Sequence, residues 1–191
     1  MYFDAFVASF ASVTVAEIGD KTQLLSLFLA ARFRPRGAII AGILLATLLN
    51  HAASAWFGAW VAQFIPAGWH AWLLGGSFIA VALWLLIPDK DDSEENAMLK
   101  YGAFAASTVL FFLAEIGDKT QIATVILAAT YDATTWVIVG TTLGMLAANV
   151  PVVYFGKYIL EVVPLDWARR VACGVFMLLG VLTIAKGMAW I

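Results

Sequence analysis

The segment AEIGDKTQ occupies residues 16–23, and the same eight residues recur at 114–121. Each copy places two acids and one lysine inside an otherwise apolar stretch of sequence. A charged side chain at bilayer depth costs at least about 2.5–3.5 kcal/mol on membrane-insertion scales. Two copies of such a cluster therefore indicate a site whose function requires buried charge.

The two copies belong to a longer duplication. Shifting the sequence by the 98 residues that separate them aligns Gly42 with Gly140 and Pro66 with Pro164, without a gap. The pair Phe57–Gly58 falls on Phe155–Gly156 in the same register. Apolar similarity alone would not keep Gly and Pro aligned, so the sequence predicts two copies of one structural unit.

The composition is that of a protein whose surface faces lipid. Of the 191 residues, 63% are hydrophobic and 13% are charged, whereas a soluble domain has about 25% charged residues. The formal net charge of −2 does not favour nucleic acid as a partner. A single cysteine, Cys173, excludes a disulfide within the chain.

We predict an all-α membrane protein with six transmembrane helices. A helix needs roughly 20 apolar residues to cross a bilayer. The apolar segments lie near residues 4–31, 37–64, 69–88, 101–129, 135–163 and 168–190.

The same duplication predicts the domain organisation. Residues 1–88 form the first three-helix repeat, 89–100 an acidic cytoplasmic linker, and 101–191 the second repeat, with helices spanning about 4–88 and 101–190. Because each repeat crosses the membrane an odd number of times, the second enters it with inverted polarity. Inverted repeats place the binding site near the bilayer midplane, where they meet.

Basic residues predict the orientation in the membrane. One side carries only Lys186, and the other carries Arg32, Arg34, Arg36, Lys90, Lys100, Lys157, Arg169 and Arg170. The positive-inside rule makes the second side cytoplasmic. We therefore expect both termini on the extracytoplasmic side.

Within the motif, the spacing suggests a shared face. Glu17 and Asp20 are three residues apart and Lys21 is four from Glu17, so on one helix they would lie together. Gly19 permits close approach of a second helix or a local break. The second copy repeats this spacing with Glu115, Asp118 and Lys119. Neutral oxygens follow in both copies, from Thr22 and Gln23 in the first and from Thr120 and Gln121 in the second.

Brought together, the two copies form an oxygen-rich site for a hard divalent cation such as Ca²⁺ or Mn²⁺. Four carboxylates and two lysines leave a charge of −2 in the empty site. One divalent cation neutralises that charge, and so do two protons. This balance is the electrostatic requirement for cation/proton exchange, with Lys21 and Lys119 as charge-balancing residues.

A purely structural interpretation is that Glu17–Lys21 and Glu115–Lys119 are ion pairs between helices. That interpretation leaves the two aspartates unexplained, and unpaired buried charge is costly. Other polar residues in the predicted spans, Asn50, His51 and Asn149, either line the ion path or hydrogen-bond a neighbouring helix. His51 aligns with Asn149, so a symmetric site does not require imidazole, and we do not expect His51 to be a primary ligand.

The repeated Glu-Ile-Gly-Asp-Lys-Thr resembles the E-x-G-D-[KR]-[TS] signature of the Gdt-type family of divalent-cation/proton exchangers. The short chain is most similar to the small bacterial manganese exporters of that family. The resemblance implies that Glu17, Asp20, Glu115 and Asp118 bind the metal, with Thr22, Thr120, Gln23 and Gln121 as accessory ligands. It also implies a multi-pass protein of the cell inner membrane.

The function expected from residues and resemblance together is Mn²⁺ export in exchange for protons. The preference for manganese comes from the resemblance alone. A Ca²⁺/H⁺ antiporter and a cation channel without proton coupling are the alternatives. We expect no enzymatic activity and no cofactor, since metal ion, protons and lipid are the only partners required. One copy is sufficient for the site, and a homodimer is compatible with it.

Overall fold

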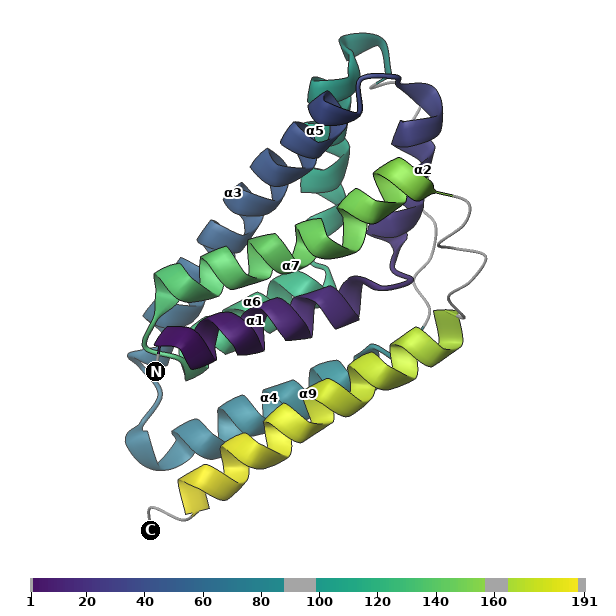
Figure 1. The fold of residues 1–191 in the computed structure, drawn as a ribbon. Helices are drawn as coiled ribbons and strands as arrows, with labels where there is room; N and C mark the ends of the chain where they lie inside the picture. The colour runs from purple at the N-terminus through teal and green to yellow at the C-terminus, as the bar shows by residue number, and fades with distance from the viewer. Residues whose placement is uncertain (1, 88–98, 157–164, 189–191) are drawn as a thin grey trace.

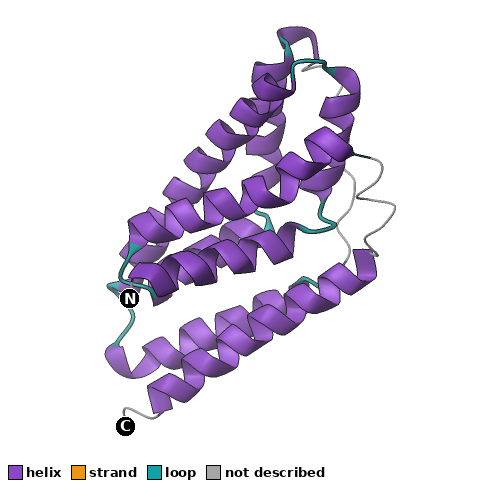
Figure 2. Ribbon diagram, viewed as in Figure 1, coloured by secondary structure: helices purple, strands orange, loops and turns teal. Residues whose placement is uncertain are grey.

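The computed structural model describes residues 2–87, 99–156 and 165–188, and these are helical apart from short connections (Figures 1 and 2). Most of the predicted linker 89–100 lies outside the described residues. The described α-helices are α1 (Tyr2–Glu17), α2 (Lys21–Arg32), α3 (Arg36–Ala62), α4 (His70–Trp84), α5 (Ala103–Glu115), α6 (Lys119–Thr130), α7 (Thr134–Phe155) and α9 (Leu165–Met188). Two short 3₁₀ helices, Ala67–Trp69 and Leu99–Tyr101, precede α4 and α5.

The motif breaks the helix in which it lies. α1 ends at Glu17 and α2 begins at Lys21, with the two helices bent by 70°. In the second copy, α5 ends at Glu115 and α6 begins at Lys119. The expectation that Glu17 and Asp20 share one helix face is therefore wrong, and the local break at the glycine is confirmed.

Two features of each motif copy produce this break. Gly19 has a φ of 81° and Gly117 a φ of 74°, a left-handed conformation that is costly for residues with a Cβ. The side-chain Oε1 of Gln23 accepts a hydrogen bond from the Gly19 amide at 2.9 Å. Gln121 does the same for Gly117 at 2.8 Å. Each glutamine thereby closes the turn that its glycine opens.

The break also places an aspartate at the start of each following helix. Asp20 and Asp118 are the N-cap residues of α2 and α6, and both have extended backbone. Asp118 accepts a hydrogen bond from the Thr120 amide at 3.4 Å. A helix N-terminus carries partial positive charge, so it stabilises a carboxylate at this position.

Equivalent glycines mediate the packing of the two halves. α1 packs on α7, and α5 packs on α3, which is the same contact after the shift between repeats. A Cβ at Gly140 would lie 2.7 Å from the Phe6 carbonyl oxygen. A Cβ at Gly42 would lie 2.7 Å from the Phe104 carbonyl oxygen. Glycine at these positions lets the helix backbones touch, as is common between membrane helices.

The helices α4 and α9 form a pair of their own, side by side at the lower edge of Figure 1. Gly75 and Gly180 bring the two backbones together, since a Cβ at Gly180 would lie 2.7 Å from the Gly75 carbonyl oxygen. This pair contacts α6 through α4 and α1 through α9. Those two contacts are not related by the shift between repeats, so the pair packs asymmetrically on the other helices.

Three helical segments are long and apolar enough to cross a membrane: Arg36–Ala62, Thr134–Phe155 and Arg170–Met188. The bent pair α1–α2 makes a fourth if it counts as one span. Large apolar side chains such as Trp56, Phe64 and Phe155 are more than half exposed, as expected for contact with lipid. The prediction of an all-helical membrane protein holds, whereas six continuous spans are not what the described residues show.

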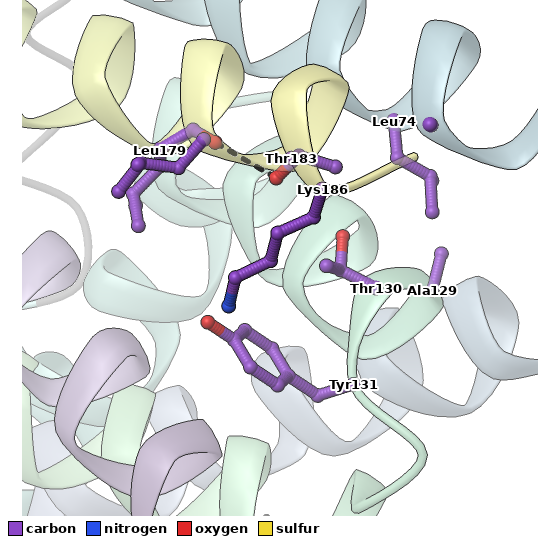
Figure 3. A pocket seen from close by; sticks show the side chains of 9 residues that line it. Leu74, Ala129, Thr130, Tyr131, Leu179, Thr183 and Lys186 are labelled. Carbon is purple, nitrogen blue, oxygen red and sulfur yellow. Dashed lines mark hydrogen bonds between the residues drawn. The ribbon is translucent and has the colours of Figure 1, made fainter. Parts of the chain in front are cut away.

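A cavity of about 330 Å³ lies between α4, α9 and the end of α6. Figure 3 shows the Lys186 amine pointing toward the Tyr131 hydroxyl across this cavity. None of the motif residues lines it. It is therefore separate from the site that the two motifs form.

Candidate cation site

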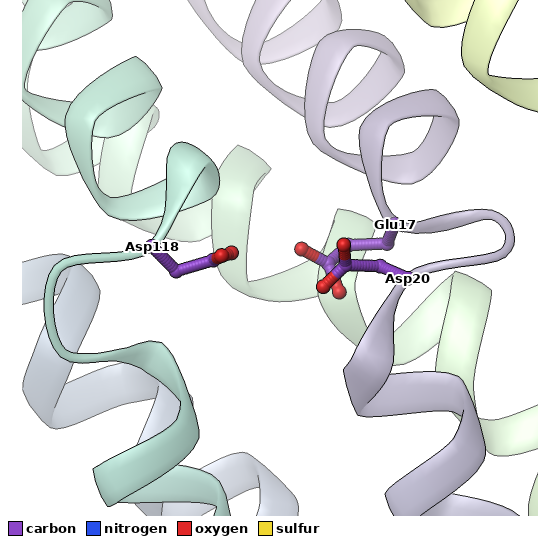
Figure 4. Close-up of side chains that lie close together, drawn as sticks. All are labelled: Glu17, Asp20 and Asp118. Atoms are coloured by element: carbon purple, nitrogen blue, oxygen red, sulfur yellow. The ribbon is translucent and has the colours of Figure 1, made fainter. Parts of the chain in front are cut away.

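Three carboxylates from the two motif breaks converge in the interior. Glu17, Asp20 and Asp118 each offer an oxygen, and these atoms lie within 4.8 Å of one another. Figure 4 shows Asp118 facing the other two across the space between the breaks. The three residues are at most 7% exposed. Buried oxygens at this separation are the donor set that hard divalent cations use in proteins.

Glu17 is held by hydroxyls from both halves of the chain. The Thr22 hydroxyl donates a hydrogen bond to Oε2 of Glu17, and the Thr120 hydroxyl donates one to Oε1. Thr22 and Thr120 are equivalent residues of the two motifs. Of the four predicted accessory residues, these two threonines contact a site carboxylate, and they orient it while each hydroxyl keeps lone pairs for a cation.

The lysines lie differently from each other. The Lys21 Nζ is 3.3 Å from Oδ1 of Asp118, so this ion pair joins the two motif copies. The Lys119 Nζ donates a hydrogen bond to the Ile87 carbonyl oxygen at 3.2 Å. The position of Lys21 suits a charge-balancing role beside the three carboxylates.

The amide side chains contribute mainly to the scaffold. Besides accepting from Gly19, Gln23 donates to the Ala148 carbonyl oxygen of α7 at 2.9 Å. Asn149 accepts from the Ser26 hydroxyl at 2.8 Å and donates to the Met145 carbonyl oxygen at 3.1 Å. Asn50 donates to the Phe112 carbonyl oxygen at 3.1 Å. Ligand roles for Gln23 and Gln121, and path-lining roles for Asn50 and Asn149, remain predictions.

The fourth motif acid is not one of the three clustered carboxylates. Glu115 is fully buried at the end of α5, and it is not a member of the three-carboxylate cluster. Its Oε2 lies 3.8 Å from Nε2 of His51 on α3, which is also fully buried. A symmetric site built from the two motifs does not predict this pairing. The signal was present in the alignment of His51 with Asn149, where the two repeats differ.

Apolar helices around a buried carboxylate cluster define an ion-handling membrane protein. The family described as "Divalent cation/proton antiporter GDT1" matches residues 5–93 and again residues 103–190. The chain therefore belongs to the GDT1 family of divalent cation/proton antiporters. The two matched ranges are the two halves of the duplication.

Relatives span bacteria and plants. The chain is 56% identical to a Vibrio cholerae protein named "Putative manganese exporter", over 92% of this chain and 88% of the relative. A GDT1-like protein of Synechocystis is 30% identical over 81% of this chain and 84% of the relative. GDT1-like protein 4 of rice is 31% identical over 74% of this chain and 59% of the relative. No solved structure matches the chain.

Proposed function

We propose that this protein exports Mn²⁺ from the cytoplasm in exchange for protons, and that the ion binds to Glu17, Asp20 and Asp118. The observation that carries the proposal is the convergence of these three buried carboxylates within 4.8 Å. Family membership supports the exchange of a divalent cation for protons. The name of the Vibrio cholerae relative supports manganese as the ion.

The charges around the site support the exchange. Three carboxylates and the adjacent Lys21 amine carry −2 together when all are ionised. One divalent cation or two protons neutralise this charge. An empty, fully ionised site inside the membrane would be costly, because buried charge needs compensation. The protein is therefore expected to exchange a bound cation for bound protons, and to resist the change between inward and outward access while the site is empty.

We propose further that the two halves are inverted repeats in the cell inner membrane, with the cytoplasm on the side of Arg32, Arg34 and Arg36. The duplicated motif breaks and the matching glycine contacts at Gly42 and Gly140 support this arrangement. In it, both termini face the periplasm. Movement of one half against the other would then open the site to alternate sides.

The test is Mn²⁺ flux into proteoliposomes with and without an imposed pH gradient. We expect gradient-driven Mn²⁺ accumulation by the native protein and none by Asp118→Asn, which keeps the side-chain shape and removes the charge. The matched control is Asp132→Asn, an exposed acid in the α6–α7 turn, which should transport normally.

Three results would contradict the proposal in different ways. Full transport by Asp118→Asn would remove the carboxylate cluster from the mechanism. Uptake that is indifferent to the pH gradient and driven by voltage would indicate a channel. Strong competition by Ca²⁺, with Ca²⁺ itself transported, would indicate a calcium exchanger.

A further inference from the structure

The pair formed by Glu115 and His51 has unsatisfied polar atoms deep in the protein. Neither carboxylate oxygen of Glu115 and neither ring nitrogen of His51 has a hydrogen-bond partner among the described residues. Both side chains have no exposed surface. Buried polar groups are nearly always hydrogen-bonded, so these four atoms in two adjacent side chains are available to a ligand such as a metal ion.

The distance between the two groups fits a shared metal ion better than a direct contact. The separation of 3.8 Å between Nε2 and Oε2 exceeds the range of a hydrogen bond. Two ligands of one ion, each about 2.2 Å from it, lie roughly 3.1 Å apart at a right angle and about 4.4 Å apart when opposite. The observed separation falls between these limits.

We propose that Glu115 and His51 form a second station for the transported ion, and that His51 makes this station selective for a transition metal over Ca²⁺. The inference rests on the proposed function, since the ligand is the transported cation. Ca²⁺ and Mg²⁺ are bound by oxygen ligands. Mn²⁺ accepts oxygen ligands as well, but it is a first-row transition metal, and imidazole nitrogen is a ligand of such metals. The three-carboxylate site offers oxygens alone and cannot make this distinction by ligand type.

The position of the pair in the chain supports a path between two stations. Glu115 and Asp118 flank the same break between α5 and α6, so the second station adjoins the first site along the chain. α3 carries His51 and packs on both α5 and α6. The equivalent residue of the other half, Asn149, has its amide oxygen and nitrogen hydrogen-bonded to Ser26 and Met145. Of the two equivalent positions, only that of His51 therefore offers a nitrogen ligand.

The experiment combines transport selectivity with spectroscopy of bound Mn²⁺. His51→Asn installs the residue of the other repeat, and His51→Gln is a second variant in case the first folds poorly. Because loss of even an outer partner of a metal ligand costs about 10–100-fold, we expect the ratio of Mn²⁺ to Ca²⁺ transport efficiency to fall by at least about tenfold. The control is His70→Asn, which replaces the other histidine of the sequence, at the start of α4.

Pulsed electron paramagnetic resonance of the Mn²⁺-loaded, tag-free protein gives a direct reading. Coordinated imidazole produces ¹⁴N modulation of the Mn²⁺ echo, which should be present in the native protein and in His70→Asn and absent in both His51 variants. Equal loss of Mn²⁺ and Ca²⁺ transport in the His51 variants, or unchanged ¹⁴N modulation, would overturn the proposal. Absence of Mn²⁺ flux in the native protein would contradict the proposed function instead, and the ¹⁴N signal would still report whether the station binds metal.

Discussion

Replacing Lys21 with Met should tighten Mn²⁺ binding, because the lysine charge opposes the cation. The Lys21 Nζ lies 3.3 Å from Oδ1 of Asp118. A divalent ion bound to that oxygen at roughly 2.2 Å would therefore lie at most about 5.5 Å from the amine. Methionine keeps the apolar stem of the side chain and removes the charge.

The size of the effect follows from Coulomb's law. Charges of +1 and +2 at about 5.5 Å repel by about 6 kcal/mol at an effective dielectric constant of 20 and by about 1.5 kcal/mol at 80. Lys21 is partly exposed, so the lower part of this range applies. Since about 1.4 kcal/mol is a factor of ten, Lys21→Met should lower the Mn²⁺ dissociation constant at least about tenfold.

The assay is titration of the purified protein with Mn²⁺ at pH 8, where protons compete least for the carboxylates. Free Mn²⁺ is read from its electron paramagnetic resonance signal. Lys21→Arg preserves the charge and should bind within a few-fold of the native protein, and Lys100→Met controls for loss of a lysine elsewhere. Tighter binding should also slow release, so the maximal transport rate of Lys21→Met should fall.

One result would refute this reasoning. If Lys21→Met bound Mn²⁺ with unchanged or weaker affinity, the amine would not oppose the cation. Lys21 would then act by holding Asp118 in place, and the charge balance on which the exchange argument depends would be wrong.

Two further predictions concern the glycines, each measured by thermal unfolding of the detergent-solubilised protein. Gly19→Ala should destabilise the protein by roughly 1–2 kcal/mol, because alanine opposes the left-handed backbone at the break. Gly37→Ala, in the first turn of α3 with open space around it, should not destabilise the protein. Equal loss of stability in Gly19→Ala and Gly37→Ala would show that the left-handed backbone is not the cause. Gly42→Ala should cost about 1–3 kcal/mol, because its Cβ would lie 2.7 Å from the Phe104 carbonyl oxygen. A Cβ at Gly174 would have no atom within 4 Å, so Gly174→Ala should leave the stability unchanged. Equal destabilisation by Gly42→Ala and Gly174→Ala would argue against backbone contact as the cause.

The sequence predicted the composition of the site better than its shape. The three clustered acids and both threonines were expected at the site from the repeated motif and the family resemblance. The duplication was read from the alignment of Gly42 with Gly140. These features follow from residue type and register, which the sequence states directly.

The departures from prediction have two physical causes. Hydrophobicity does not distinguish a continuous helix from two helices joined by a turn, so the segments around Gly19 and Gly117 were predicted as single spans, with a break at Gly19 only as one of two alternatives. Symmetry in sequence also does not require symmetry in one conformation. The separation of Glu115 from the cluster depends on how α3, α5 and α6 pack, and no local pattern reports that packing.

The hydrogen bond from Thr120 to Glu17 has a consequence for the molecule as a whole. The shift between repeats converts this bond into one from Thr22 to Glu115. A hydroxyl has one proton to donate, and Thr22 donates its proton to Glu17. The two arrangements therefore exclude each other, although they use the same set of groups. The duplicated motif therefore allows two alternative hydrogen-bond patterns, one around Glu17 and one around Glu115. The structure shows the pattern in which both threonines donate to Glu17.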